Sequence, residues 1–342
     1  MAPMPTSDQK PPAHVGIMQL LNGSYIAGAV SCLAQFRIPD LVEAGPRSAE
    51  ELASQIRANP QALYRLMRAT ASVGVLSEGP DGKFSETPMS AVLRSNGTPS
   101  LRDFAIMGGR EWCARGWAHL EYCVRTGKQA LDQIYGEPIF KYFEQNPEEA
   151  KIFNVAMTSL SAIDSPAVAK AYSFDQIHSL VDVGGGHGLL LATIMAQNPH
   201  LKGTLYDEQH VVEGAKNGPL KPMMERCALV SGDMFASVPA GADAYIMKHI
   251  IHDWPDDQCL KILKACRSGI NSGGKLLVVD CVIQPGSDFS PAKFLDLQML
   301  IFPGGCERTE KQFRELFAAS GWRLTRIVPT ASTESIVAGL PA

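Results

Sequence analysis

Residues 182–188 read Asp-Val-Gly-Gly-Gly-His-Gly, and the segment from His178 to Val183 has the composition of a buried strand. Glycines at positions 184, 186 and 188 let the backbone turn sharply and approach a ligand at the N-terminus of the next helix. Leu189 stands where the dinucleotide fingerprint has its last glycine, and no Gly-Lys-Ser/Thr follows as in a P-loop. The loop therefore predicts a nucleotide-type site and disfavours NAD, FAD and P-loop phosphate binding.

The chain after about Tyr172 alternates short strand-like segments with helical segments. This alternation predicts a parallel, doubly wound sheet, which is a Rossmann-like α/β domain. Ligands of such sheets bind at the carboxyl ends of the strands, so we expect functional residues in the loops that follow them. The predicted strands are 178–183, 202–206, 227–230, 244–247 and 275–279.

The N-terminal part has a helical pattern. Apolar and small residues recur at helical spacing from Ile17 to Val42, which suits closely packed helices. Residues 48–51 form a capping box, and Asn59 caps a second helix that runs to about Ser72. Residues 75–78 and 83–85 form a strand hairpin, which completes a winged helix-turn-helix pattern.

These patterns divide the chain into three segments. Residues 1–105 are expected to form a helical winged-helix domain, 106–170 a mostly helical connection that contributes to the substrate pocket, and 171–342 the Rossmann-like catalytic domain. Met1 to His14 lack the apolar core of a signal peptide, so we expect an unstructured leader there.

Composition narrows the classes of function. The 342 residues are 45% hydrophobic and 19% charged, and the formal net charge of −4 gives no overall attraction to nucleic acid or to an anionic membrane. Uninterrupted apolar runs are much shorter than the roughly 20 residues of a membrane helix. The eight cysteines include no C-x-x-C pair, which indicates reduced cysteines of a cytoplasmic protein. We therefore expect neither a nucleic acid nor a membrane partner.

The winged-helix pattern alone would also suit a DNA-binding regulator, and this alternative stays open. The second helix of the pattern offers only Arg65 and Arg68 as cations, among apolar Leu63, Leu66 and Met67. DNA-binding surfaces need more positive charge than this, so the pattern disfavours DNA.

Acidic residues follow the second and third predicted strands. Asp207 lies about 20 residues after the glycine loop, where a carboxylate accepts hydrogen bonds from ribose hydroxyls. Residues 232–235, Gly-Asp-Met-Phe, place a carboxylate, a thioether and a ring where an adenine could be bound. A cationic sulfonium nucleoside fits a site with several carboxylates.

The candidate catalytic residues come after the fourth predicted strand. Methyl transfer to a phenol requires removal of the phenolic proton, and a neutral imidazole can accept it near pH 7. We expect His252 to be the general base, with Asp280 and Glu307 orienting its ring or stabilising its charged form. His249, His252 and Asp256 form a weak metal pattern without a further ligand cluster, so no metal is predicted.

Together these motifs resemble a known family. The sequences Asp-Val-Gly-Gly-Gly-His-Gly at 182–188, Gly-Asp-Met-Phe at 232–235, Met-Lys-x-x-x-His-Asp-Trp at 247–254 and Gly-Gly-x-Glu-Arg-Thr at 304–309 are similar to those of caffeate and acetylserotonin type O-methyltransferases and their bacterial relatives. The likeness spans nearly the whole chain, and residues 48–68 resemble the family's winged-helix dimerisation domain. The resemblance implies a homodimer whose N-terminal domain swaps into the partner's active site.

Carried over by motif, the resemblance implies S-adenosylmethionine as the cofactor and His252, Asp280 and Glu307 as the catalytic group. Residues 206–209 replace the usual Phe-Asp-Leu-Pro, His249 stands where Trp is common, and Asp280 stands where plant members carry Glu. Asp280 has a shorter side chain than that Glu. The motifs and the resemblance together give the cofactor-binding residues as Gly184, Gly186, Asp207, Gly232, Asp233, Met234, Phe235 and Lys248.

Substrate contacts are expected from Met and aromatic side chains, which can enclose a planar ring, and from polar residues beside them. The sequence thus predicts O-methylation of a phenolic or enolic hydroxyl on an aromatic small molecule. N-methylation or a non-methylating reaction with the same fold and cofactor remains an alternative. The predicted substrate-binding residues are Trp112, Phe153, Asn154, Met157, Asp253, Met299 and Phe302.

Overall fold

The computed structural model describes residues 12–342, which divide into two compact units. Unit 1 contains the chain up to Arg115 together with 146–160, and unit 2 contains 116–145 and 161–342. The expected connecting segment, 106–170, is thus divided between the two units. Most of the expected leader lies outside the described residues, but its last two residues, Ala13 and His14, belong to helix α1, which begins directly after Pro12.

Unit 1 is built mainly from helices. Ser48 and Glu51 form the predicted capping box, and the Asn59 side chain accepts a hydrogen bond from the Ala62 amide, so both predicted helix starts are confirmed. Strands β1 (Ser77–Glu78) and β2 (Phe84–Ser85) pair antiparallel and complete the predicted winged helix. Its helices are α1 (Ala13–Leu21), α2 (Gly23–Gln35), α3 (Ile38–Leu41), α4 (Ala49–Ile56), α5 (Pro60–Ala71), α6 (Pro88–Ala91), α7 (Arg102–Gly108), most of α8 (Glu111–Ala118) and the first part of α12 (Pro147–Ala171).

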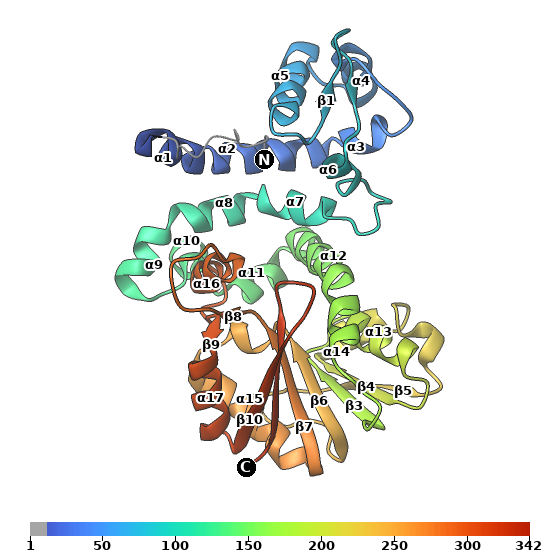
Figure 1. Cartoon of the computed structure of the whole chain (residues 1–342), viewed down its shortest axis with the longest axis vertical. Helices are drawn as coiled ribbons and strands as arrows, with labels where there is room; N and C mark the ends of the chain where they lie inside the picture. The colour runs from blue at the N-terminus through green and yellow to red at the C-terminus, as the bar shows by residue number, and fades with distance from the viewer. Residues whose placement is uncertain (1–11) are drawn as a thin grey trace. The chain divides into compact units, whose positions relative to one another are not determined.

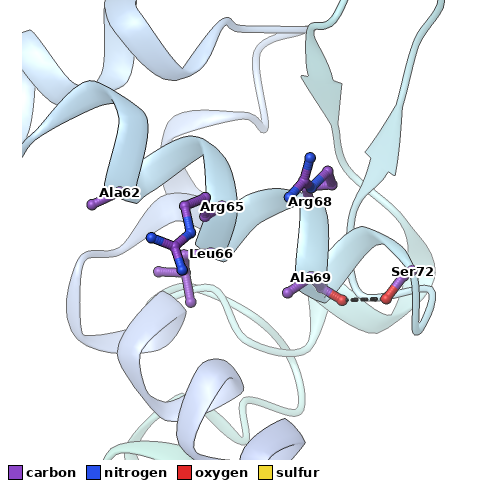
Figure 2. Close-up of a pocket in the computed structure, with 6 residues that line it drawn as sticks. All are labelled: Ala62, Arg65, Leu66, Arg68, Ala69 and Ser72. Atoms are coloured by element: carbon purple, nitrogen blue, oxygen red, sulfur yellow. Dashed lines mark hydrogen bonds between the residues drawn. The ribbon is translucent and has the colours of Figure 1, made fainter.

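A surface hollow of unit 1 lies along α5, and none of the predicted site residues lines it. Arg65 and Arg68 line it and point in different directions (Figure 2). The Arg68 guanidinium lies over the Tyr64 ring, 5.4 Å from its centroid, which is a cation–π contact within the helix. Arg65 and Arg68, the two cations of the helix considered for DNA binding, therefore do not point toward a common site. The hollow is lined by Ala62, Arg65, Leu66, Arg68, Ala69 and Ser72.

Residues 13–35 form a helical stretch that is long and apolar enough to cross a membrane, by length and composition alone. The mean hydropathy of its most apolar window is 1.3. The expectation of no spanning segment rested on uninterrupted apolar runs, and it missed this stretch because Gln19, Asn22 and Ser24 interrupt its apolar residues. Helices of soluble proteins and signal sequences meet the same criterion, so the stretch alone does not indicate a membrane.

Unit 2 contains a seven-stranded sheet in the order β10-β11-β7-β6-β3-β4-β5, seen in Figure 1. The five predicted strands are all present and pair in parallel as predicted. They are β3 (Ser179–Val183), β4 (Lys202–Asp207), β5 (Cys227–Ser231), β6 (Ala242–Lys248) and β7 (Ile270–Asp280).

The C-terminal strands were not predicted. β10 (Trp322–Pro329) and β11 (Ser335–Pro341) pair antiparallel, and β11 also pairs antiparallel with β7. The sheet is therefore mixed rather than wholly parallel. The reason is the short connection of residues 330–334, because a parallel pair would need a crossover of a dozen residues or more.

Two apolar layers cover the two faces of this sheet. Leu180, Ile246 and Leu277 pack with α12 and α13 on one face. Val181, Met247 and Val278, which alternate with them along the strands, pack with α15 and α17 on the other. The remaining elements of unit 2 are α9 (Leu120–Thr126), α10 (Ala130–Tyr135), α11 (Ile139–Gln145), α13 (Leu189–Gln197), α14 (Gln209–Ala215), α15 (Asp256–Gly269), α16 (Pro291–Ile301), α17 (Glu310–Ala319), the 3₁₀ turns η1 (Lys221–Met223) and η2 (Ile251–Asp253), and the short parallel pair β8 (Val282–Ile283) and β9 (Arg308–Thr309).

Arg308 is the largest buried cation described in unit 2, with 1% of its surface exposed. Its guanidinium donates to the carbonyl oxygens of Ile251 at 2.8 Å, Trp254 at 3.1 Å and Cys306 at 3.2 Å. It also donates two hydrogen bonds, of 2.7 and 3.1 Å, to one carboxylate oxygen of Asp256. The side chain thereby ties η2 and the start of α15 to the segment that leads into β9.

We expect Arg308→Met to lower the free energy of unfolding by about 3 kcal/mol or more, because the carbonyl oxygens of Ile251, Trp254 and Cys306 lose the guanidinium, and an unsatisfied buried polar group costs about 1–3 kcal/mol. The Ile251 and Trp254 carbonyls would keep only the weak thiol donor of Cys259. Urea denaturation measures this change. The matched control, Asp256→Asn, should cost less than about 1 kcal/mol, because the Asp256 side chain is 72% exposed. Equal losses in both variants would contradict a role for the carbonyl contacts.

Candidate active site

The glycine loop after β3 has the backbone that its sequence predicts. Gly184 and Gly186 have positive φ angles of 68° and 59°, which favour glycine. A Cβ atom on Gly184 would overlap the Ile250 side chain, whereas a Cβ on Gly186 would meet no atom within 4 Å. The amide of Gly186 donates a 2.8 Å hydrogen bond to Oδ2 of Asp207. The loop and the acid at the end of β4 are therefore brought together, as predicted.

The acid after β4 and the loop after β5 are adjacent. The Asp207 carboxylate also accepts a 2.7 Å hydrogen bond from the Glu208 amide, and the Gly232 amide donates to the Asp207 carbonyl at 3.0 Å. Burial raises the pKa of Asp207, although hydrogen bonds from the Gly186 and Glu208 amides oppose this. Gly232 is needed because a Cβ there would overlap the Tyr206 ring hydroxyl.

The loop after β5 presents the predicted adenine-binding residues. Asp233 is exposed and Oδ1 accepts a 2.8 Å hydrogen bond from the Phe235 amide, while Met234 and Phe235 are half-buried. The Phe235 ring meets the Trp254 ring edge-on, with centroids 4.8 Å apart. These features fit the nucleoside part of S-adenosylmethionine. The glycine turn is open, Asp207 offers a fixed carboxylate to the ribose, and Asp233 with its apolar neighbours suits the adenine.

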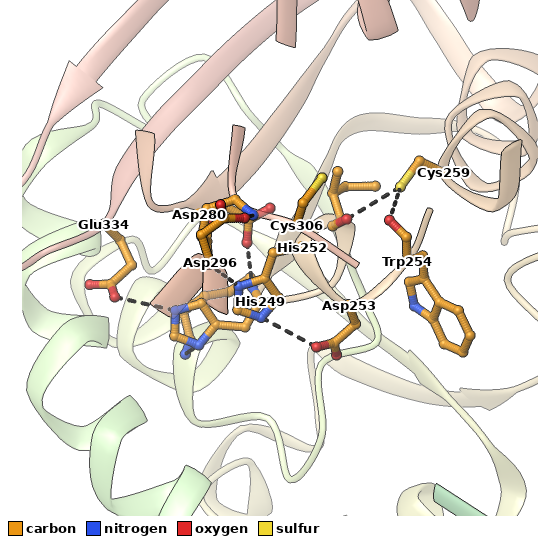
Figure 3. Close-up of polar contacts among 12 residues, drawn as sticks. His249, His252, Asp253, Trp254, Cys259, Asp280, Asp296, Cys306 and Glu334 are labelled. Carbon is orange, nitrogen blue, oxygen red and sulfur yellow. Dashed lines mark hydrogen bonds and ion pairs between the residues drawn. The ribbon is translucent and has the colours of Figure 1, made fainter. Parts of the chain in front are cut away.

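The predicted catalytic group is also brought together. His252 lies in η2 and is 6% exposed, and its Nδ1 lies 2.6 Å from Oε1 of Glu307. Because a carboxylate accepts, Nδ1–H donates this bond and Nε2 is left to accept a proton. Nε2 lies 3.5 Å from Oδ1 of Asp253. Figure 3 shows His252 among Asp253, Asp280 and His249.

A glycine in the segment before Glu307 permits the close contact between Glu307 and His252. A Cβ on Gly305 would overlap the His252 carbonyl oxygen and the backbone of Asp253 and Trp254. The Glu307 amide donates to Oδ1 of Asp296 at 2.9 Å, which fixes the backbone on the other side. Gly305, Glu307 and Arg308 of the Gly-Gly-x-Glu-Arg-Thr motif thus act together on one turn.

The acids around His252 control its protonation. Burial disfavours the charged ring, but the Asp253 carboxylate, the Glu307 hydrogen bond and the Asp280 charge together raise the His252 pKa to about 9. Burial raises the pKa of Asp253 to about 6, while the charge of His252 opposes that rise. Asp280 is fully buried, and burial also raises its pKa. Oδ1 of Asp280 accepts a 3.1 Å hydrogen bond from the His249 amide, so this acid also fixes the catalytic turn.

A second polar group beside the catalytic residues was missed from the sequence. Lys248 was predicted to bind the cofactor, but Asp164 in α12 and Glu334 before β11 were not singled out. Ligand atoms of Asp164, His249 and Glu334 all lie within 4.8 Å of one another, so among the described residues they could hold a metal ion. This is not the His249, His252 and Asp256 pattern considered above. Asp164 and Glu334 carried no recognisable motif, because their proximity depends on α12 and β11 meeting at one edge of the sheet.

The predicted substrate-binding residues are divided between the units. Asp253, Met299 and Phe302 lie in unit 2, where Met299 and Phe302 are buried. Trp112 belongs to unit 1, and its indole N–H donates to Glu149 at 3.1 Å. Phe153, Asn154 and Met157 lie on the part of α12 that belongs to unit 1. Asp253 is the member that lies beside His252, and the substrate roles of the seven residues stay predictions.

Comparison with known proteins agrees with this geometry. The O-methyltransferase domain family matches residues 117–323, and the O-methyltransferase dimerisation domain family matches residues 18–96. These two matches correspond to the catalytic sheet and to the winged-helix part of unit 1.

Curated relatives and solved structures match nearly the whole chain. The phenazine O-methyltransferase PhzM of Lysobacter antibioticus is 38% identical over 326 residues, which cover 95% of each chain. The mitomycin biosynthesis 6-O-methyltransferase of Streptomyces lavendulae is 35% identical, covering 93% of this chain and 91% of the relative. The calicheamicin biosynthesis methyltransferase CalO1, solved with S-adenosylhomocysteine (SAH) bound, matches with a TM-score of 0.86 and 31% identity over 96% of this chain and 98% of that one. The chain therefore belongs to the S-adenosylmethionine-dependent O-methyltransferase family and carries that family's dimerisation domain.

Proposed function

We propose that the protein methylates a phenolic or enolic hydroxyl of an aromatic small molecule, with His252 as the general base. The observation that carries this proposal is the 2.6 Å contact between Nδ1 of His252 and Glu307, which leaves Nε2 to receive a proton. Relatives named for phenazine and mitomycin O-methylation support an aromatic acceptor. The expected location is the cytoplasm.

In this proposal, different residues of unit 2 bind the cofactor, remove the proton and stabilise the charge that results. The loops with Gly186, Asp207 and Asp233 would bind the nucleoside, and Nε2 of His252 would take the proton of the acceptor hydroxyl. Asp253 and Glu307 would stabilise the imidazolium that forms. S-adenosylmethionine supplies the methyl group to the deprotonated oxygen and leaves as SAH.

We expect His252→Ala to lower kcat by about 10²- to 10⁴-fold, which is the usual contribution of a general base. The measurement is SAH release with a panel of phenols, hydroxyquinones and aromatic amines. SAH binding should be retained within about twofold in the variant. His178→Ala, an exposed histidine before β3, serves as the control and should keep full activity.

Three outcomes of this experiment would change the assigned base or the assigned reaction. Full turnover of a phenol by His252→Ala would remove His252 as the base. Release of SAH with amines alone would favour N-methylation, and substrate conversion without SAH would favour a non-methylating reaction.

The acids around His252 generate a second prediction, on pH. Only the neutral ring can accept a proton, and the His252 pKa is raised to about 9, so kcat/KM should increase with pH up to about 9. In Glu307→Gln the loss of a negative charge should lower this pKa, which moves the rising limb to lower pH while the plateau rate falls. The exposed Glu310→Gln is the control and should leave the profile unchanged. A limb that stays in place in Glu307→Gln would contradict the assignment.

We further propose that the apolar face of α1 and α2 pairs with a second copy of the chain. Leu20 is 77% exposed and Tyr25 is 76% exposed, and Ile17, Met18 and Leu21 are exposed beside them. A contiguous apolar surface of this kind marks an interaction site. Light scattering should give a dimer mass for the wild type and a monomer mass for Leu20→Glu/Leu21→Glu. A monomeric wild type at micromolar concentration would refute this.

A further inference from the structure

Four residues from separate elements form a charged cluster beside the catalytic group. Asp164 lies on α12, Lys248 ends β6, His249 follows it, and Glu334 precedes β11. Asp164 and Glu334 are 7% and 4% exposed. All four belong to unit 2, and His249 is stacked on the catalytic His252 ring, with centroids 5.0 Å apart and planes 14° apart. We call these four residues the charged cluster.

Glu334 is held as a carboxylate by hydrogen-bond donors. It accepts from the Ser332 hydroxyl at 2.6 Å, from the Thr333 hydroxyl at 2.8 Å and from Nε2 of His249 at 3.3 Å. Burial opposes the charged form of Glu334, but these hydrogen bonds keep its pKa below the usual range. The segment of residues 330–334 thus presents one ionised carboxylate to His249.

The hydrogen bonds define the state of His249 and the direction of Lys248. Because Nε2 donates to Glu334, Nδ1 of the neutral ring is an acceptor, and Nζ of Lys248 lies 3.3 Å from it. Burial and the neighbouring Lys248 charge lower the His249 pKa to about 3, which agrees with a neutral ring. Glu334 therefore orients the His249 ring, and the ring orients the Lys248 ammonium. Because the ring is neutral, it does not cancel the charge of the ammonium.

The cluster holds opposite charges side by side. Burial disfavours the Lys248 ammonium, and the charges of Asp164, Glu334, Asp182 and Asp280 oppose that effect. A metal ion at Asp164, His249 and Glu334 would compete with the ammonium that already faces the His249 ring. Buried charges of both signs within one cluster suit a ligand that also carries both signs, since each charge of the ligand then meets an opposite charge.

We propose that the charged cluster binds the amino-acid end of S-adenosylmethionine, with Asp164 pairing with the α-ammonium and Lys248 with the α-carboxylate. Glu334 and His249 act as positioning residues for Lys248. The inference rests on the proposed function, because it assumes that the nucleoside lies over the glycine loop. It adds Asp164, His249 and Glu334 to the cofactor site and explains why they gather next to the base.

The experiment is calorimetric titration of the full-length protein, in a buffer with EDTA, with SAH and with 5′-methylthioadenosine, which lacks the amino-acid end. Asp164→Asn should weaken SAH binding by about tenfold or more, the loss expected for a charge-assisted hydrogen bond. Binding of 5′-methylthioadenosine should stay within about twofold. The exposed Asp175→Asn, which lies before β3, is the matched control and should change neither.

Decarboxylated S-adenosylmethionine, which keeps the ammonium and lacks the carboxylate, tests which residue meets which charge. Asp164→Asn should weaken its binding, whereas Lys248→Met should weaken SAH binding and leave this ligand nearly unchanged. An equal loss for SAH and 5′-methylthioadenosine in Asp164→Asn, or no loss, overturns the proposal. So does SAH binding that disappears in EDTA and returns with Zn²⁺. If wild type binds neither nucleoside, the nucleoside site itself fails, which is a different result.

Discussion

The buried guanidinium of Arg308 is the constraint on which the active site depends. It holds the carbonyl oxygens on both sides of His252 and Asp253, and it is the residue next to Glu307. A guanidinium has five donors in a fixed plane, so one side chain can fix two backbone segments that are more than 50 residues apart in the chain. The 2.6 Å contact between His252 and Glu307 follows from this arrangement. Gly305 contributes by having no side chain, because any Cβ there would push the two segments apart.

The distribution of charge around this turn matches the chemistry of a sulfonium donor. Asp164, Asp182, Asp253 and Asp280 all have pKa values raised by burial, and Lys248 is the cation that faces three of them. Such a site favours a positively charged occupant more than a neutral one. Transfer of the methyl group removes the positive charge from the sulfur, so the same acids would bind the product less tightly than the reactant.

The sequence predicted the elements whose structure is determined by residues that are neighbours in the chain. The glycine loop, the capping box at Ser48 and the five parallel strands depend on nearby residues, and all were located correctly. β10 and β11 were missed, and it is β11 that joins them to the sheet, by pairing with β7, which is distant in sequence. His252 and Glu307 could be paired through their motifs, whereas Asp164 and Glu334 have no motif and meet because the fold places the middle of α12 beside the start of β11.

The conformation of His249 explains why the base and the charged cluster are adjacent. His249 has φ 57°, a left-handed conformation that is uncommon for a residue with a side chain, and its amide donates both to Asp280 and to the Val279 carbonyl. This sharp turn at the end of β6 sends the chain into η2, which begins two residues later, so the His249 and His252 rings stack. A larger ring at position 249 could stack on His252, but it could not both donate to Glu334 and accept from Lys248. Histidine at this position therefore couples the residues that we assign to the cofactor's amino-acid end to the residue that we assign to proton removal.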